Sequence, residues 1–346
     1  MDESIGTVDV EVDFSKKALE VFFGFENRKN AKIALAKNNY KKLEPFLKDE
    51  FIVYNSLLYT IHFSQNKIAK KIINAFYKNK KYDVNRNHSE IFKFAVYYKN
   101  AYLVRLLVNC GSDIHVDKDY AFIQFCLLGN TDMVQFLIEN GADVYARDSL
   151  ALIQASGSNN IDLVNFLLKH IEIKPSEKLI EYQATNYDLA LISATICKQN
   201  NIALLLLLKG ANPTINNSEV LVIASESGNI DLVHSFLSKG ADPNISGGLP
   251  LEKAVRNGHI DVVKEFVNFQ IDGEYVCDLS IDNSAALIWA CYKGFEEIAK
   301  LLIESKTSDG KPRCDINAHN NDAYRLARLR NNTSIIKLLE EHGGNN

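Results

Sequence analysis

The sequence predicts an all-α protein: a helix-turn-helix solenoid of about ten stacked repeats joined by short hairpin loops. Three observations support this fold class. A segment recurs at a period near 30 residues, the apolar residues of each copy keep helical spacing, and a glycine or asparagine separates the two helical patterns in most copies. The recurrence is visible in "GNTDMVQFLIENGADVY" (129–145) and "GNIDLVHSFLSKGADPN" (228–244). Self-similarity at such a period is typical of arrays whose stacked units share one core.

Each copy can be numbered from an anchor, which is the residue that follows the break between its two helical patterns. Four of the nine spacings between anchors are 30 residues, and the others are 26, 35, 36, 37 and 39. The ten anchors are Asn39, Gln65, Asn100, Asn130, Asn160, Gln199, Asn229, His259, Phe295 and Asn332.

The first helix of each copy is indicated by two positions before the anchor. Position 8 before it is apolar in every copy, and position 5 before it is alanine in eight, with Thr60 and Phe125 as the exceptions. An alanine column between large apolar columns predicts that two backbones approach closely there. Serines stand where four of these helices should begin, and we interpret them as N-caps. They are Ser89, Ser149, Ser218 and Ser284.

The second helix of each copy is indicated by positions 4 and 7 after the anchor, which are apolar in all ten copies. Residues at these separations lie on one helix face. The residue just before the anchor is glycine or asparagine in seven copies. These residue types tolerate the left-handed backbone that ends a helix, so this position predicts the turn between the two helices.

Four loops are longer than the rest: 74–88, 171–187, 270–283 and 304–321. An Asp-Gly pair in 270–283 predicts an extended hairpin, the segment 305–320 reads likewise, and 171–188 has room for an extra helical turn. Insertions in repeat proteins often lie on the binding face, but drift in exposed loops produces the same pattern. The repeat array is predicted to occupy residues 28–346. Residues 1–27 form an N-terminal segment that is either disordered or a cap.

These columns resemble the ankyrin repeat. The segment "GLPLEKAVRNGHIDVVKEFV" (248–267) is similar to the family's first helix, Gly-His turn and second helix, and "NGADV" (140–144) and "KGADP" (239–243) match its hairpin. The histidine of the family's Thr-Pro-Leu-His opening is absent, and its position holds residues such as Ile123 and Glu252. The short repeats also resemble those of giant DNA viruses of amoebae, protists or intracellular bacteria. The resemblance implies a non-enzymatic scaffold that binds another protein through its concave face and hairpin tips.

The sequence contains no recognisable catalytic, cofactor or metal-binding motif. HExxH, P-loop, GxSxG and CxxC patterns are absent, so we expect no catalytic residues, no cofactor and no metal. His259 falls at the Gly-His turn and is interpreted as a turn residue that bonds backbone groups. The net charge of −4 gives no general reason to expect a nucleic-acid partner. No signal peptide or long apolar run is seen, so we expect an intracellular, cytoplasmic monomer that is not inserted in a membrane.

Candidate contact residues come from the hairpin tips and from the exposed side of the first helices, where position 3 before the anchor should face solvent. Aromatic and arginine side chains are enriched at such contacts. We expect the main contact on repeats seven to nine, although Trp289 has a second interpretation as a wedge between repeats. The alternative function is a host-directed adaptor that presents a captured protein to ubiquitin ligase or other host machinery. The candidates are Tyr145, Arg147, Glu226, Arg256, Trp289 and Tyr292.

Overall fold

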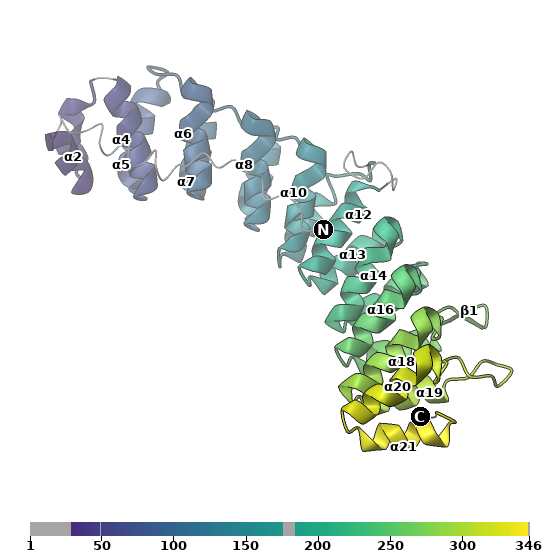
Figure 1. Ribbon diagram of the computed structural model, residues 1–346. Coiled ribbons are helices and arrows are strands. Elements are labelled where there is room, and N and C mark those ends of the chain that lie inside the picture. The colour runs from purple at the N-terminus through teal and green to yellow at the C-terminus, as the bar shows by residue number, and fades with distance from the viewer. Residues whose placement is uncertain (1–28, 49, 176–183, 345–346) are drawn as a thin grey trace. The chain divides into compact units, whose positions relative to one another are not determined.

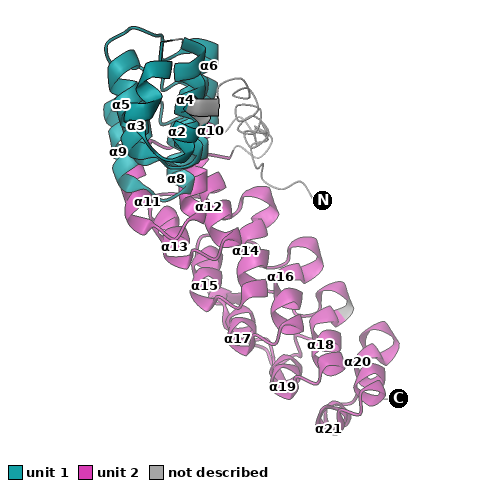
Figure 2. Cartoon of the chain, turned by 90° about the vertical axis from the view of Figure 1, so that its left-hand side faces the viewer, with its two compact units in different colours: residues 1–147 teal, residues 148–346 magenta. Residues whose placement is uncertain are grey.

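The computed structural model describes residues 29–48, 50–175 and 184–344. Over these residues ten helix pairs follow one another along the chain (Figure 1). The chain divides into two compact units, Met1–Arg147 (unit 1) and Asp148–Asn346 (unit 2), which Figure 2 colours separately. The all-α repeat fold that the sequence predicts is confirmed. The expectations for residues 1–27 lie outside the described residues.

The first helix of each pair starts the repeat, and the second returns beside it. The first helices are α2 Lys29–Ala36, α4 Glu50–His62, α6 Arg86–Tyr97, α8 Val116–Leu127, α10 Ala146–Gly157, α12 Asn186–Ile196, α14 Ile215–Ser227, α16 Ile245–Arg256, α18 Ile281–Lys293 and α20 Ala318–Leu329. The second helices are α3 Tyr40–Leu43, α5 Asn66–Ile72, α7 Ala101–Val108, α9 Thr131–Glu139, α11 Ile161–Leu167, α13 Asn200–Leu208, α15 Ile230–Ser238, α17 Ile260–Asn268, α19 Glu296–Glu304 and α21 Thr333–Glu341. A 3-10 turn, η2 Glu44–Phe46, extends α3, and a π-helical turn, η3 Ile73–Tyr77, extends α5.

Each unit is built from two layers of helices. In unit 1, α4 packs on α6 and α6 on α8, while α5 packs on α7 in the other layer. In unit 2 the first helices α12 to α20 stack in one row and the second helices α11 to α21 in another, as Figure 2 shows. From α14 to α20 the first helices pack more closely together than the second helices do.

The buried columns are those that the sequence pattern predicts. The alanines five residues before the anchors are all nearly inaccessible, and Thr60 and Phe125 are equally buried at the two exceptional copies. Eighteen of the twenty side chains at positions 4 and 7 after the anchors are buried, and Phe46 and Ile336 are half-buried. Small side chains on the first helices therefore allow neighbouring backbones to approach closely, and the large side chains of the second helices fill the remaining space in the core.

The serines interpreted as N-caps have a different role, and that prediction is wrong. Their backbones are left-handed, with φ between 51° and 59°, whereas an N-cap residue is typically extended. The hydroxyl groups of Ser218 and Ser284 accept hydrogen bonds from the backbone N–H groups of Asp242 and Asp315, each in the following repeat. The Ser149 hydroxyl likewise accepts from the Asn186 amide, and the Ser89 hydroxyl donates to the side chain of Asn85.

The bonds accepted by Ser218 and Ser284 belong to a wider series of contacts between repeats. A hairpin N–H group of one repeat donates to a side-chain oxygen of the repeat before it at six junctions. In the copy anchored at His259, Gly248 occupies the position of the serine and has no side-chain acceptor. There the Asn244 side chain, four residues earlier, accepts the hydrogen bond from the Asp278 N–H group at 2.8 Å. The donor and acceptor pairs are Asp113 to Asn85, Asp143 to Asp119, Asn212 to Asp188, Asp242 to Ser218, Asp278 to Asn244, and Asp315 to Ser284.

True N-caps occur at the anchors instead. The side chains of five anchor asparagines accept a hydrogen bond from the N–H group three residues later, which satisfies an open donor of the second helix. The turn before most anchors is left-handed, as predicted, although Asn159 is an exception. The capping asparagines are Asn39, Asn100, Asn130, Asn160 and Asn229.

The long loops of unit 2 contain short hairpins. Strand β1, Gln270–Ile271, pairs antiparallel with β2, Glu274–Tyr275, around the Asp-Gly turn, so the hairpin prediction for this segment is confirmed. A bridge between Lys306 and Pro312 closes a second hairpin. Both extend from the same side of unit 2 in Figure 1. In the loop 171–187, Pro175 pairs with Thr185, and the residues between them that were expected to hold an extra helical turn lie outside the described residues.

A buried arginine joins the two hairpins of unit 2. The Arg313 guanidinium donates to the carbonyl oxygens of Val267 and Cys277 at 2.5 and 2.8 Å, and it lies 3.8 Å from the centre of the Tyr275 ring. Arg313 is only 8% exposed. One side chain from the second hairpin therefore ties together the end of α17, the first hairpin and its own loop.

Candidate protein-binding surface

Four of the six candidate residues lie on the first-helix layer of unit 2. Glu226 stands on α14, Arg256 on α16, and Trp289 and Tyr292 on α18. Glu226 and Arg256 are exposed, and the two aromatic residues are half-exposed. Leu329, the corresponding residue on α20, is 70% exposed. These five residues form a continuous series across neighbouring repeats, which we call the inner strip.

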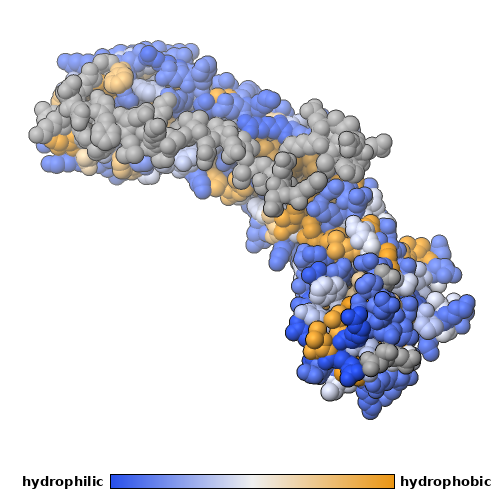
Figure 3. All heavy atoms as spheres, viewed as in Figure 1, coloured by the Kyte–Doolittle hydropathy of each residue, from blue (hydrophilic) through white to orange (hydrophobic). Residues whose placement is uncertain are grey.

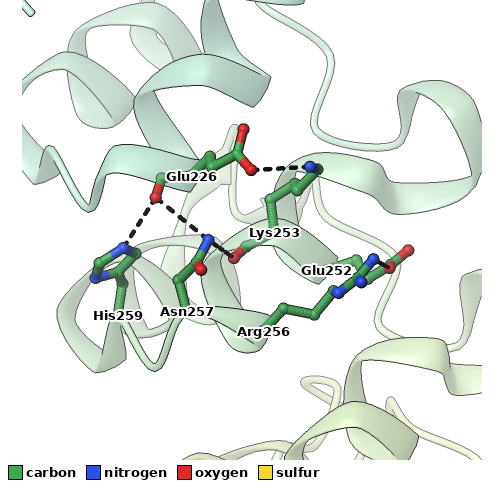
Figure 4. A network of polar contacts seen from close by, with 6 residues as sticks. All are labelled: Glu226, Glu252, Lys253, Arg256, Asn257 and His259. Atoms are coloured by element: carbon green, nitrogen blue, oxygen red, sulfur yellow. Dashed lines mark hydrogen bonds and ion pairs between the residues drawn. The ribbon is translucent and has the colours of Figure 1, made fainter.

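Glu226 is held by the repeat that follows it. Its carboxylate pairs with the Lys253 ammonium at 2.9 Å. Its backbone carbonyl oxygen accepts hydrogen bonds from the Asn257 amide at 3.3 Å and from the His259 ring at 3.0 Å (Figure 4). The interpretation of His259 as a turn residue bonding backbone groups is confirmed. These contacts fix the end of α14 against the turn after α16.

Arg256 is held from two sides. Its guanidinium pairs with the Glu252 carboxylate at 3.0 Å, one helical turn earlier on the same face of α16, and Figure 4 shows these two side chains lying side by side. The guanidinium carbon also lies 4.2 Å from the centre of the Trp289 ring on the next first helix. A cation over an indole face at this distance is attracted by the ring quadrupole.

Trp289 and Tyr292 continue this arrangement toward the C-terminus. Their rings meet edge to face, with centroids 5.7 Å apart and planes at 87°. The Arg330 guanidinium covers the Tyr292 ring at 4.1 Å and donates a hydrogen bond to its hydroxyl group. Arg256, Trp289, Tyr292 and Arg330 thus form one stack that crosses three repeats. The contact with Arg256 places the Trp289 ring against the neighbouring repeat, and the ring also remains half-exposed. Its role as a partner contact stays a prediction.

A pocket of about 360 Å³ adjoins this stack between α18 and α20. Trp289 and Tyr292 contribute to its wall. The Asp322 carboxylate in the pocket is held by Arg325 at 2.6 Å and by the His319 ring at 2.5 Å. The lining residues are Asp282, Ala285, Ile288, Trp289, Tyr292, His319, Asp322 and Leu326.

The remaining two candidates, Tyr145 and Arg147, belong to unit 1. The Arg147 guanidinium donates to the backbone carbonyl oxygen of Asp117 in the preceding repeat at 2.7 Å. The Tyr145 N–H group donates to the Asp143 carboxylate at 2.9 Å, within the hairpin. Both residues are only half-exposed. For Arg147 the structure thus indicates a contact between repeats.

Unit 1 has an exposed aromatic cluster of its own on α4 and α6. The His62 ring stacks edge to face on Phe63 and on Tyr98, and its Nδ1 lies 2.5 Å from the Tyr98 hydroxyl oxygen. Tyr97 contacts Tyr98 and is 43% exposed. Burial lowers the pKa of His62, which favours a neutral ring. Sequence patterns place His62 and Tyr97 in the exposed column, but the ring contacts depend on the stacking of neighbouring repeats.

Sequence reasoning missed Asp282 and Asp322, which line the pocket, and the contact of Arg330 with Tyr292. Arg330 and Tyr292 are 38 residues apart in the chain, so no local pattern connects them. Figure 3 shows that mostly hydrophilic side chains cover the face of unit 2 turned to the viewer, with hydrophobic ones gathered in small patches. On a mostly hydrophilic surface, a defined aromatic stack is more distinctive than the small scattered hydrophobic patches.

The described residues contain no group of three or more histidine, cysteine or acidic side chains placed to hold a metal ion. All six cysteines are unpaired. None of the described helices combines the length and the apolar character that crossing a bilayer requires.

A comparison with protein-family models agrees with the repeat geometry. The family model described as "Ankyrin repeats (3 copies)" matches residues 92–178, 191–275, 221–319 and 251–346, which together make up more than half of the chain. The chain belongs to the ankyrin repeat family. Arrays of this family generally act as protein–protein interaction modules and are typically non-enzymatic, and no catalytic domain was found in this one.

Among solved structures, the array is similar to the human ASB11 ankyrin repeat domain. The sequence identity is 16% and the TM-score is 0.42, and the match covers 60% of this chain and 96% of that domain. No curated protein matches the chain in sequence.

Proposed function

We propose that this ankyrin array is a non-enzymatic scaffold that binds another protein along the inner strip of unit 2. The observation that carries the proposal is the stack of Arg256, Trp289, Tyr292 and Arg330 on the first-helix layer. Aromatic and arginine side chains account for most of the binding energy at protein interfaces. Here they are gathered on adjacent helices, with the two arginines exposed and the two aromatic rings half-exposed.

The contacts within the stack support this role. A long side chain that is free in solution loses roughly 0.5–1.5 kcal/mol of conformational freedom when an interface immobilises it. Arg256 is already held by Glu252 and Trp289, and Tyr292 is already covered by Arg330. Part of the ordering cost of binding is therefore met when the array folds.

Capture from a lysate of the source cells, followed by mass spectrometry, tests this proposal. The bait is the full chain, compared with the double variant Arg256→Ala with Tyr292→Ala and with the control Tyr97→Ala. We expect a partner protein that the parent chain and the control retain and that the double variant loses. A partner retained equally by all three baits would place the binding surface elsewhere, and the absence of any specific partner would contradict the scaffold role.

The same experiment addresses the adaptor alternative. The adaptor alternative predicts that ubiquitin ligase subunits are recovered together with the partner. If the double variant loses the partner but retains the same amount of ligase subunits per bait molecule, those subunits bind a second surface. A single partner in stoichiometric amount supports the simpler scaffold.

A further inference from the structure

The pocket beside the stack combines a size, a wall and a charge that indicate one kind of occupant. Its volume of about 360 Å³ lies near the lower end of the range typical of ligand pockets, about 300–1,000 Å³, so one long side chain fits inside it. Its wall is largely apolar, with Ile288 and Leu326 on facing helices and the rings of Trp289 and Tyr292 beside them. A long side chain with a hydrocarbon stem could lie along this wall.

The polar groups of the pocket leave one negative charge without a counter-ion. Asp322 is engaged on both carboxylate oxygens, by Arg325 and His319. Asp282, at the start of α18, is exposed, and no cation of the described residues pairs with its carboxylate. A group that fills this pocket would bind most favourably if it placed a positive charge next to the Asp282 carboxylate.

The contacts that the two aromatic rings already make favour one kind of cation, the guanidinium group. Each already carries a guanidinium group from its own chain, Arg256 on Trp289 and Arg330 on Tyr292. A guanidinium is planar, stacks on aromatic faces, and pairs with a carboxylate through two N–H groups. An ammonium group offers neither the stacking nor the paired donors.

We propose that this pocket binds an arginine side chain of the partner protein, with the stem along Ile288, Trp289 and Leu326 and the guanidinium at Asp282. The inference rests on the proposed scaffold function and adds to it the chemistry of the segment that is bound. The partner would present an arginine in an exposed segment to the groove between α18 and α20.

Trp289 makes the test specific, because it is the only tryptophan in the chain. The probes are two blocked tripeptides, acetyl-Gly-Arg-Gly-amide and acetyl-Gly-citrulline-Gly-amide, which differ in charge but hardly in shape. Each is titrated at low salt into the full chain, and the indole N–H resonance and the fluorescence of Trp289 are followed. We expect a saturable change with the arginine peptide and an affinity about tenfold or more lower with citrulline, because charge-assisted hydrogen bonds are lost.

The matched variants are Asp282→Asn, in the pocket, and Asp261→Asn, an exposed carboxylate on the second helix α17. Asp282→Asn should reduce the affinity for the arginine peptide to that for citrulline, and Asp261→Asn should leave it unchanged. Circular dichroism checks that both variants fold. Equal affinities for the two peptides, no response to either, or equal effects of the two variants would overturn the inference.

The failure of this inference can be told apart from the failure of the scaffold function. If capture shows a partner that depends on Arg256 and Tyr292 while the tripeptides show no preference for charge, the scaffold function stands and the arginine pocket is wrong. If the pocket prefers arginine but no partner is captured, the scaffold function is wrong.

Discussion

At the scale of single residues, exposure separates the six cysteines into groups. Cys197 is exposed at the end of α12, and Cys110 is half-exposed. Burial raises the pKa of the Cys277 and Cys291 thiols to about 12 and that of Cys314 to about 11. The thiolate is the reactive form, so a raised pKa and burial act in the same direction and make these thiols unreactive at neutral pH.

Thiol labelling at pH 8 should therefore modify Cys197 first and Cys110 more slowly. Cys126, whose pKa is also raised by burial, should react with the other buried thiols only after the array unfolds. Mass spectrometry of peptides after timed labelling measures this order. Rapid modification of Cys126 in the folded chain would show that Cys126, on α8, is not buried as described.

At the scale of the element, the alanine column determines how closely the first helices approach. Ala224 on α14 is fully buried, whereas Ser227, one turn later, is exposed. The two positions belong to the same helix and differ in which side they face. Substituting the same residue at both positions therefore separates the effect of core packing on stability from the effect of helix propensity.

The substitution Ala224→Leu should lower the free energy of unfolding by about 1–3 kcal/mol, because added atoms force neighbouring helices apart. Ser227→Leu should change it by less than about 0.5 kcal/mol, as exposed substitutions usually do. Chemical denaturation followed by circular dichroism compares the two. Equal losses would mean that the orientation of α14 is not the one described.

The hairpins of unit 2 depend on a different kind of contact. Replacing Arg313 by alanine removes the donor from two buried carbonyl oxygens, those of Val267 and Cys277. An unsatisfied buried polar group costs about 1–3 kcal/mol, so we expect a loss of about 2 kcal/mol or more and faster proteolysis within residues 270–283. The exposed Lys306→Ala, in the same loop as Arg313, is the control and should change neither measurement. Unaltered proteolysis in Arg313→Ala would show that the hairpin holds its shape alone.

At the scale of the whole molecule, the proposed binding surface draws on residues from several repeats. The inner strip draws on α14, α16, α18 and α20, and no single helix pair contains more than two of its members. The double variant Arg256→Ala with Tyr292→Ala should weaken binding of the captured partner by about 2 kcal/mol or more, because both side chains belong to the central stack. Its stability should change less than its affinity, because Arg256 is exposed and Tyr292 half-exposed.

Titration calorimetry with the purified partner measures this loss. Tyr97→Ala, at the same repeat position in unit 1, is the control and should leave the affinity nearly unchanged. A larger loss for Tyr97→Ala than for the double variant would move the binding surface to the aromatic cluster of unit 1.

Most of the fold could be read from the sequence because the pattern that specifies it is local. Ala224 and Leu221 lie on one face of a helix, and Val233 and Phe236 on one face of the next, so spacing alone shows which faces are buried. The anchor position also marks the turn, since Gly228 can adopt the left-handed backbone at no cost. The candidate residues Glu226 and Arg256 could be placed on the exposed side by the same argument.

Only the tertiary structure decided which side chains meet across repeats. The serines at the starts of the first helices have the residue type of an N-cap, but the nearest donors for Ser218 and Ser284 belong to the next repeat. The contact of Arg256 with Trp289 and that of Arg330 with Tyr292 depend on the distance and rotation between neighbouring helix pairs. Those two quantities result from the packing of many buried side chains at once. The period of the sequence therefore determines each repeat, whereas the surface that the repeats form together is set by how they stack.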